Sequence, residues 1–141
     1  MINVVICAFK SGDVLGYTLP QLVNERSITR ILIADGPHLG DIKPGYKADN
    51  PTVKDVVDNI GSDKIYYEYT DDCHTRSQKV NRVLSNAKDC EWFLNVDSDE
   101  VYHEEDLARL ATFLRNGPDF DRYKIHTINP YPDFHHEFRI P

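Results

Sequence analysis

One stretch, residues 92–100 with the sequence WFLNVDSDE, most strongly limits the folds that this chain can adopt. Its first five residues are mostly aromatic or apolar, a pattern that predicts a buried parallel strand. Acidic residues follow at once, so Asp97 and Asp99 come at the carboxyl end of that strand. Open α/β folds bind their ligands at this edge of the sheet. The sequence therefore predicts a ligand site built around these two carboxylates.

The spacing of Asp97 and Asp99 indicates a metal ion. In locally extended chain, residues two apart project on the same side. No lysine or arginine is adjacent to them in the sequence, so a bound divalent cation would relieve the repulsion between the two carboxylates. Oxygen ligands favour Mg²⁺ or Mn²⁺, with water and substrate phosphates completing the coordination. The alternative is a solvated acidic turn that caps the next helix and binds no metal.

The rest of the chain alternates predicted strands and helices. Short apolar runs predict strands at residues 2–9, 31–34, 64–70, 122–127 and 136–140. Apolar residues at helical spacing predict helices near residues 14–23, 51–60, 75–88 and 104–115. This order predicts an α/β fold, a three-layer sandwich with a mainly parallel, Rossmann-like central sheet. The 141 residues suffice for a single domain.

Helix-start signals locate three of these helices. Asp13 is expected to cap the first one. Asn50 is expected to cap the second, with Pro51 as its first residue. Thr75 and Gln78 have the spacing of a capping box, which predicts the start of the third.

Composition excludes several classes of function. The formal net charge of −7 argues against broad binding of nucleic acid or anionic membranes. The cysteines, Cys7, Cys73 and Cys90, show no C-x-x-C spacing, so neither a zinc site nor a disulfide framework is predicted, and a reduced, cytoplasmic location is expected. Cys7 lies inside an apolar run and is expected to be a small buried hydrophobe. Neither an integral membrane segment nor a signal peptide is predicted.

The predicted topology gathers further polar residues around the acidic pair. Carboxyl ends of parallel strands meet at one edge, which would bring Lys10 and Asp35 to the acidic turn, with Arg76 and Lys79 on a helix that begins there. Such a set fits a nucleoside diphosphate: a carboxylate for base or ribose, a metal for the phosphates and a cation for the leaving charge. The ordinary alternatives are a turn-forming role for Asp35 and solvated surface positions for Arg76 and Lys79.

At this point the residues resemble a known family. WFLNVDSDE resembles the strand and D-x-D-E element of family 2 glycosyltransferases with the GT-A fold, and the preceding helix in QKVNRVLSNAKDCEWFLNVDSDE resembles the segment that leads into it. The opening VVICAFKSGDVLGYTLPQLVN and the strand ILIADG match the family's first βαβ unit in style. The resemblance implies a nucleotide-diphosphate sugar donor, a Mn²⁺ or Mg²⁺ ion and an unknown acceptor, and it favours inversion over retention. The acceptor-side part is expected to be minimal or missing.

The resemblance also implies roles for individual residues. The positions it assigns to nucleotide binding are Ala8, Lys10, Asp35, Arg76, Lys79, Asp97 and Ser98. Among them, Ala8 and Lys10 would approach the base, and Asp35 would contact base or ribose.

The metal and the chemistry fall on the acidic turn. Asp97 and Asp99 would serve ribose, metal and diphosphate, with Asp99 as the more direct metal ligand. Val80 stands where the family has an arginine, so Arg76 or Lys79 would have to replace it. The family's catalytic base normally lies beyond a chain of this length; Glu137 is the candidate here, with Asp133 as a second.

Three alternatives to a glycosyltransferase stay open. A nucleotidyltransferase of similar topology would need a glycine-rich, basic phosphate loop after the first strand, for which Lys10-Ser11-Gly12 gives thin support. A donor-binding module without catalysis would explain the missing base. A generic α/β domain with an acidic turn would bind no nucleotide at all.

Overall fold

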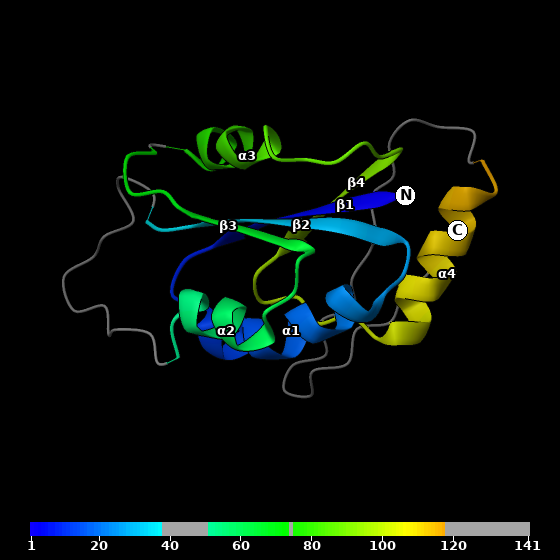
Figure 1. The fold of residues 1–141 in the computed structure, drawn as a ribbon, viewed down its shortest axis with the longest axis horizontal. Coiled ribbons are helices and arrows are strands. Elements are labelled where there is room, and N and C mark those ends of the chain that lie inside the picture. Colours follow the sequence, from blue (N-terminus) through cyan, green and yellow to red (C-terminus); the bar gives the residue numbers. More distant parts are fainter. Residues whose placement is uncertain (38–50, 74, 118–141) are drawn as a thin grey trace.

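Four parallel strands form the centre of the computed structural model, which describes residues 1–37, 51–73 and 75–117 (Figure 1). The strands are β1 (Ile2–Ala8), β2 (Ile28–Asp35), β3 (Ile65–Tyr69) and β4 (Trp92–Asp97). They lie in the order β3-β2-β1-β4, and every neighbouring pair is parallel. The predicted α/β fold with a mainly parallel sheet is confirmed. The predicted strands at residues 122–127 and 136–140 lie outside the described residues.

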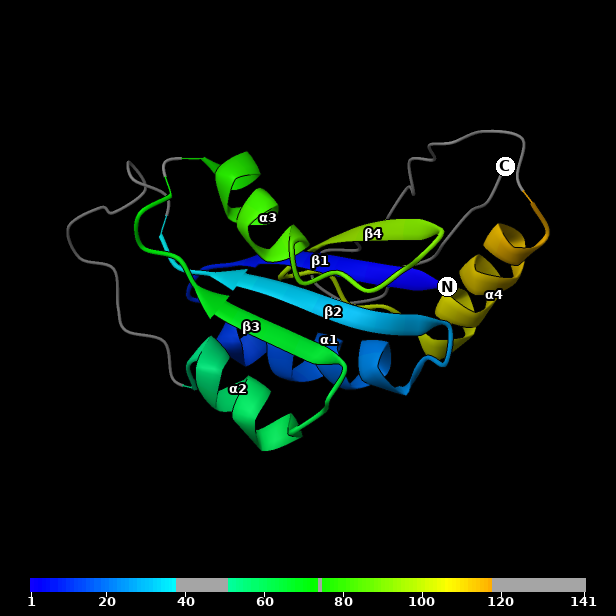
Figure 2. The same ribbon diagram turned by 45° about the horizontal axis from the view of Figure 1, so that its top comes forward.

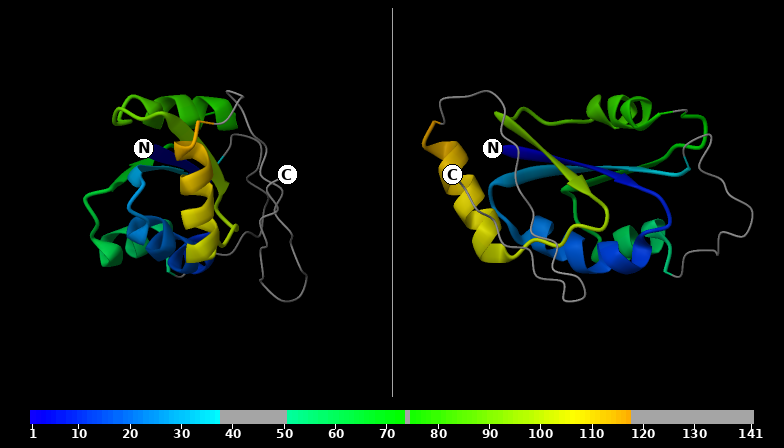
Figure 3. Two further views of the ribbon diagram at one scale, coloured as in Figure 1. Left: turned by 90° about the vertical axis from the view of Figure 1, so that its right-hand side faces the viewer. Right: turned by 180° about the vertical axis from the view of Figure 1, so that it is seen from behind.

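Helices cover both faces of this sheet and one of its ends. They are α1 (Gly12–Asn24), α2 (Val53–Ile60), α3 (Arg76–Leu84) and α4 (Glu104–Arg115). Figures 1 and 2 show α1 and α2 on one face and α3 on the other, which gives the three layers. Figure 3 shows α4 beside the amino ends of the strands, steeply inclined to them. Within the described ranges, no helix has both the length and the apolar character to cross a bilayer.

The burial pattern explains why β1 and β2 read as continuous apolar runs. Val4 and Ile6 belong to the larger hydrophobic cluster, on the side of α1 and α2. Val5 and Leu32 belong to a smaller cluster with Val83 of α3. Because the middle of the sheet is covered on both sides, successive residues of these strands are buried.

Two helix starts differ from prediction. Ser11 caps α1, and Asp13 lies within its first turn. Thr52 caps α2 in place of Asn50, because its hydroxyl accepts from the Asp55 N–H while the Asp55 carboxylate accepts from the Thr52 N–H. This reciprocal pair satisfies two N–H groups that the helix cannot bond itself.

The third helix starts as predicted and ends early. Thr75 and Gln78 form the expected capping box. The helix ends at Leu84, several residues before position 88. There the Ser85 hydroxyl donates to the Arg82 carbonyl and the Asn86 amide donates to Ser85. Such local side-chain bonds compete with helix continuation.

Candidate functional site

A hollow of about 510 Å³ opens at the carboxyl edge of the sheet, where β1 and β4 end. It is lined by the end of β1, the start of α1, the start of α3 and the turn after β4. The lining residues include Cys7, Lys10, Ser11, Arg76, Asp97 and Asp99. The strand order reverses at β1, because β2 and β3 lie on one side of it and β4 on the other. Open α/β sheets bind ligands at this switch point.

The acidic residues after β4 form a tight turn. The Glu100 N–H donates to the Asp97 carbonyl over 3.0 Å, which closes the turn. The Glu100 carboxylate accepts from the Asp97 N–H over 3.1 Å and from the Tyr102 hydroxyl over 2.7 Å. The expected extended conformation is therefore wrong, yet Asp97 and Asp99 both line the hollow. Glu100 therefore stabilises the turn through hydrogen bonds within it.

Arg76, the first residue of α3, forms an ion pair with Asp97. Its guanidinium Nη2 donates to Asp97 Oδ1 and lies 3.5 Å from Asn95 Oδ1. The sequence analysis placed Arg76 near the acidic turn, but its charge argument considered only adjacent residues and did not predict that Arg76 pairs with Asp97. The two side chains are 45% and 51% exposed. An exposed pair contributes about 0–1 kcal/mol, so a ligand can replace either partner at low cost.

Cys7 also reaches the hollow, which the sequence analysis did not foresee. It is half-buried and pairs in register with Asp97 at the end of β1. Burial raises the pKa of its thiol, although the positive charges of Arg76 and Lys79 oppose that rise. The thiol is therefore protonated at neutral pH. Cys7 is the next-to-last residue of β1, and this position in the strand, more than its apolar neighbours, could have indicated that it reaches the hollow.

Lys79 is fully buried, so a solvated surface position is wrong. Its ammonium Nζ donates to the Ala8 carbonyl over 3.0 Å and to the Gly36 carbonyl over 2.5 Å. Burial lowers the pKa of Lys79. These bonds tie the ends of β1 and β2 together, and Lys79 is absent from the lining of the hollow.

Asp35 lies at the same edge but is engaged within the fold. It is 8% exposed. Its Oδ2 accepts from the Tyr67 hydroxyl and its Oδ1 from the Gly36 N–H, over 2.9 and 2.7 Å. Burial, followed by the bond to Asp35, raises the pKa of Tyr67. Gly36 has a φ of +120°, and a Cβ there would lie 2.4 Å from the Thr70 carbonyl oxygen, so this turn requires glycine.

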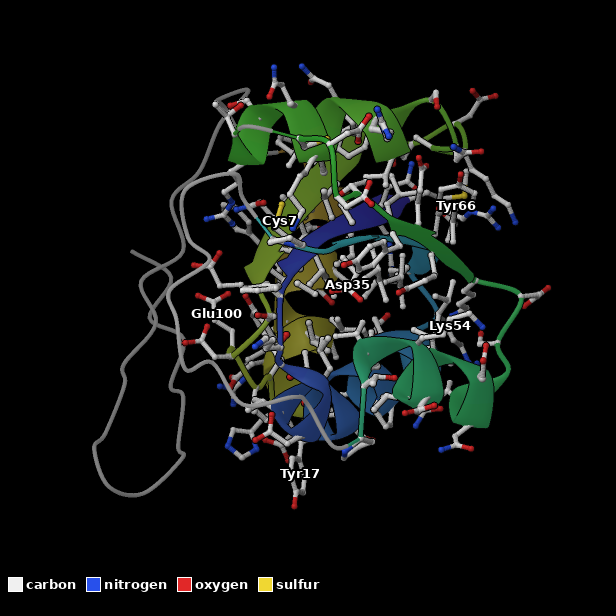
Figure 4. The ribbon with its side chains drawn as sticks, turned by 90° about the vertical axis from the view of Figure 1, so that its left-hand side faces the viewer. Cys7, Tyr17, Asp35, Lys54, Tyr66 and Glu100 are labelled. Carbon is white, nitrogen blue, oxygen red and sulfur yellow. The ribbon has the colours of Figure 1, made fainter. Side chains whose placement is uncertain are left out.

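The structure thus divides the predicted nucleotide-binding and metal-binding residues into two groups. Lys10, Arg76, Asp97, Ser98 and Asp99 line the hollow. The other three predicted residues, Ala8, Asp35 and Lys79, are buried beside it. Figure 4 looks onto this edge and shows Cys7 and Glu100 on one side, with Asp35 further toward Tyr66.

Lys10 and the two candidate bases complete the set of predicted site residues. Lys10 has a φ of +50°, and its ammonium lies 5.6 Å from the ring centroid of Phe9. Glu137 and Asp133, the candidate bases, lie outside the described residues.

The donor set at the turn suits a hard cation that keeps part of its water. Among the described residues, no group of three or more His, Cys, Asp or Glu side chains could enclose a metal ion. Asp97 and Asp99 offer two carboxylates on an open hollow. Mg²⁺ and Mn²⁺ sites of this kind use one or two carboxylates and take their other ligands from water and substrate phosphates.

Comparison with known proteins supports the fold. No protein-family model matches the chain, and no curated protein matches it. The chain is similar to the crystal structure of S. aureus TarS 1-349, with a TM-score of 0.60 and 17% identity, and to TarS 1-349 in complex with UDP, with a TM-score of 0.57 and 18% identity. Each match covers 82% of this chain and 32% of the TarS chain. At this identity the likeness shows a shared fold, and the chain spans about a third of the structures it matches.

Proposed function

We propose that this domain binds a nucleotide-diphosphate sugar together with Mn²⁺ or Mg²⁺ and transfers the sugar to an acceptor. One observation carries the proposal: the hollow at the β1–β4 edge presents Asp97, Asp99 and Arg76 together, on a fold shared with a glycosyltransferase that has been crystallised with UDP. Acidic ligands for a cation and a fixed positive charge are the two requirements of a departing diphosphate.

Within this proposal, Asp97 and Asp99 would hold the metal ion. The ion supplies charge neutralisation for the diphosphate leaving group. Arg76 adds a positive charge. Its backbone position is fixed because it is the first residue of α3, directly after the capping residue Thr75. Lys10, which also lines the hollow, adds a second positive charge.

The Arg76–Asp97 ion pair links these roles. While the two side chains are paired, each compensates the charge of the other. If Asp97 held a metal ion, Arg76 would lose its partner, and its partly exposed guanidinium would be able to turn to the phosphates. Arginine suits that role because its planar fork matches phosphate oxygens.

Transfer itself requires a base for the acceptor hydroxyl. Direct, inverting displacement with Glu137 as the base is the proposed route, and Asp133 is the second candidate. Because the chain spans about a third of the TarS structures, catalysis by this chain is a further step in the proposal, beyond binding of the sugar nucleotide.

A thermal-shift titration tests the binding step. UDP, GDP and their sugars are added with and without Mn²⁺ to the wild type and to Asp99→Asn. A site at a hundred times its Kd stabilises the fold by about 2.7 kcal/mol, which is a shift of several degrees in a domain of this size. We expect a metal-dependent shift in the wild type that is lost in the variant.

Asp89→Asn is the matched control, because Asp89 is an exposed aspartate before β4, away from the hollow. It should respond like the wild type. If no nucleotide shifts the wild type, the proposal fails. If sugar nucleotides bind and neither hydrolysis nor transfer can be detected, the domain is a binding module.

A further inference from the structure

Ser11 has a buried hydroxyl without a hydrogen-bond partner in the part of the chain that the structure describes. The residue is 8% exposed and lines the hollow. A serine that caps a helix usually accepts from an N–H group of the first turn, but Ser11 makes no such bond. A buried hydroxyl left unpaired is costly. Ser11 therefore has bonding capacity that a ligand can use.

The start of α1 offers further donors beside this hydroxyl. The Leu15 N–H donates to the Ser11 carbonyl and the Val14 N–H to Asp13 Oδ1, each over 2.9 Å. Helix geometry gives the first N–H groups, here those of Gly12 and Asp13, no acceptor within the helix. The 13 residues of α1 also place a partial positive charge at this end.

Close packing fixes these donors in place. A Cβ at Gly12 would lie 2.1 Å from the Pro51 carbonyl oxygen, so the first turn of α1 is seated directly against the chain that leads into α2. The donors are thus held in position before a ligand arrives, and preorganised donors bind more tightly than mobile ones.

The two sides of the hollow therefore differ in chemistry. Asp97 and Asp99 form an acidic side suited to a cation. Ser11 and the first turn of α1 form a donor side. Asp13 also lines the hollow, and its negative charge opposes a bare anion. A diphosphate that arrives with a divalent cation presents less charge and can bridge the two sides.

We infer that the Ser11 hydroxyl and the first N–H groups of α1 bind the terminal phosphate of a nucleoside diphosphate. The inference rests on the proposed function, since it assigns a subsite within the same hollow. It predicts that recognition of the diphosphate depends on the start of α1 as well as on the acidic turn. Helix starts of this kind bind phosphate through N–H groups and the helix dipole.

Calorimetric titration of the wild type and Ser11→Ala with UDP, UMP and inorganic pyrophosphate, all with Mg²⁺, tests this subsite. We expect the variant to bind UDP and pyrophosphate about tenfold more weakly, the effect of one lost bond to a charged group, and to bind UMP unchanged. Because the removed hydroxyl has no hydrogen-bond partner among the described residues, the substitution should not lower the melting temperature. Ser85→Ala, at an exposed serine beyond the far end of α3, is the control.

The outcomes separate this inference from the proposed function. If pyrophosphate binds the wild type more tightly than Ser11→Ala while no nucleotide binds, the subsite stands and the proposed function falls. If UDP binds both proteins equally, the subsite falls and the proposed function stands. If the variant binds UMP more weakly to the same extent as UDP, Ser11 contacts the nucleoside monophosphate part, which would overturn the inference. If no probe binds the wild type, both fail.

Discussion

The two halves of the carboxyl edge contain similar residues and use them differently. In the β2–β3 half, the charged groups bond inside the fold. Asp35 accepts from the Tyr67 hydroxyl and from a backbone N–H, and Lys79 donates to two backbone carbonyls. In the β1–β4 half, Arg76 and Asp97 pair at an exposed position beside the hollow. Charge and position on the edge therefore do not identify a binding residue. What distinguishes the second half is that its charged groups face solvent and can exchange their partners.

The difference follows from how the edge is covered. The Thr70 N–H and hydroxyl both donate to the Asp35 carbonyl, so the chain after β3 packs onto the end of β2. Groups enclosed in this way must bond internally, because a buried group without a partner costs about 1–3 kcal/mol. At the end of β4 the chain turns sharply at Asp97 and leaves the neighbouring hollow open.

The largest effect on stability is expected when the buried cation, Lys79, is replaced. Lys79→Met should lower the free energy of unfolding by about 2–4 kcal/mol, because the Ala8 and Gly36 carbonyls lose their donor. Urea denaturation measures the change. Lys54→Met, at an exposed lysine paired with Asp58, should change stability by less than about 1 kcal/mol. Equal stability of Lys79→Met and the wild type would mean that burying the ammonium costs as much as its bonds contribute.

A smaller loss is expected from Tyr67→Phe, which removes the hydroxyl that donates to Asp35. We expect a loss of about 1–2 kcal/mol at neutral pH. The pKa of Tyr67 is raised in the folded protein, so the unfolded chain releases the phenol proton first, near pH 10. Stability from this group is complete below that pH and declines above it. The gap between wild type and variant should therefore narrow above pH 10.

Tyr69→Phe is the control for this series, since Tyr69 is an exposed tyrosine of the same strand. Unfolding curves at several pH values from 7 upward provide the measurement. A gap that stays constant or widens above pH 10 would contradict a raised pKa for Tyr67.

The smallest effect on stability is expected in the β1–β4 half. Arg76→Gln removes an exposed ion pair and should change the free energy of unfolding by less than about 1 kcal/mol. Affinity for UDP with Mg²⁺ should fall about tenfold or more, because a charged bond to phosphate is lost. Arg82→Gln, at another exposed arginine of α3 with acidic partners, should leave this affinity unchanged. A large loss of stability in Arg76→Gln with unchanged affinity would reverse the distinction between the two halves.

The fold could be predicted because its signals are local. Apolar runs in β1 and β4 and the alternation of strands with helices are properties of neighbouring residues. The acidic turn could be located for the same reason, since it directly follows a buried strand. The Thr75–Gln78 capping box was visible as a spacing of three residues and starts α3 as expected.

Pairings between distant elements could not be predicted in the same way. The Arg76–Asp97 pair joins α3 to β4, and no local pattern indicates it. Lys79 is an intermediate case. It lies four residues before Val83, so both share the buried side of α3, and that spacing could have indicated its burial. The sequence analysis assigned the cap of the first helix to Asp13 and considered Ser11 only as part of a weak phosphate-loop pattern. Only the hydrogen bonds of the first turn show that the Ser11 hydroxyl lacks a partner among the described residues.

The direction of β1 has a practical consequence for attaching this protein to a surface or a dye. The strand runs for seven residues from the Met1 end of the sheet to the hollow, a distance of about 20 Å at the rise of a parallel strand. The Met1 amine lies at the opposite edge, where it forms an exposed pair with Glu91. A tether on that amine would leave the hollow facing away from the support, open to ligands in solution.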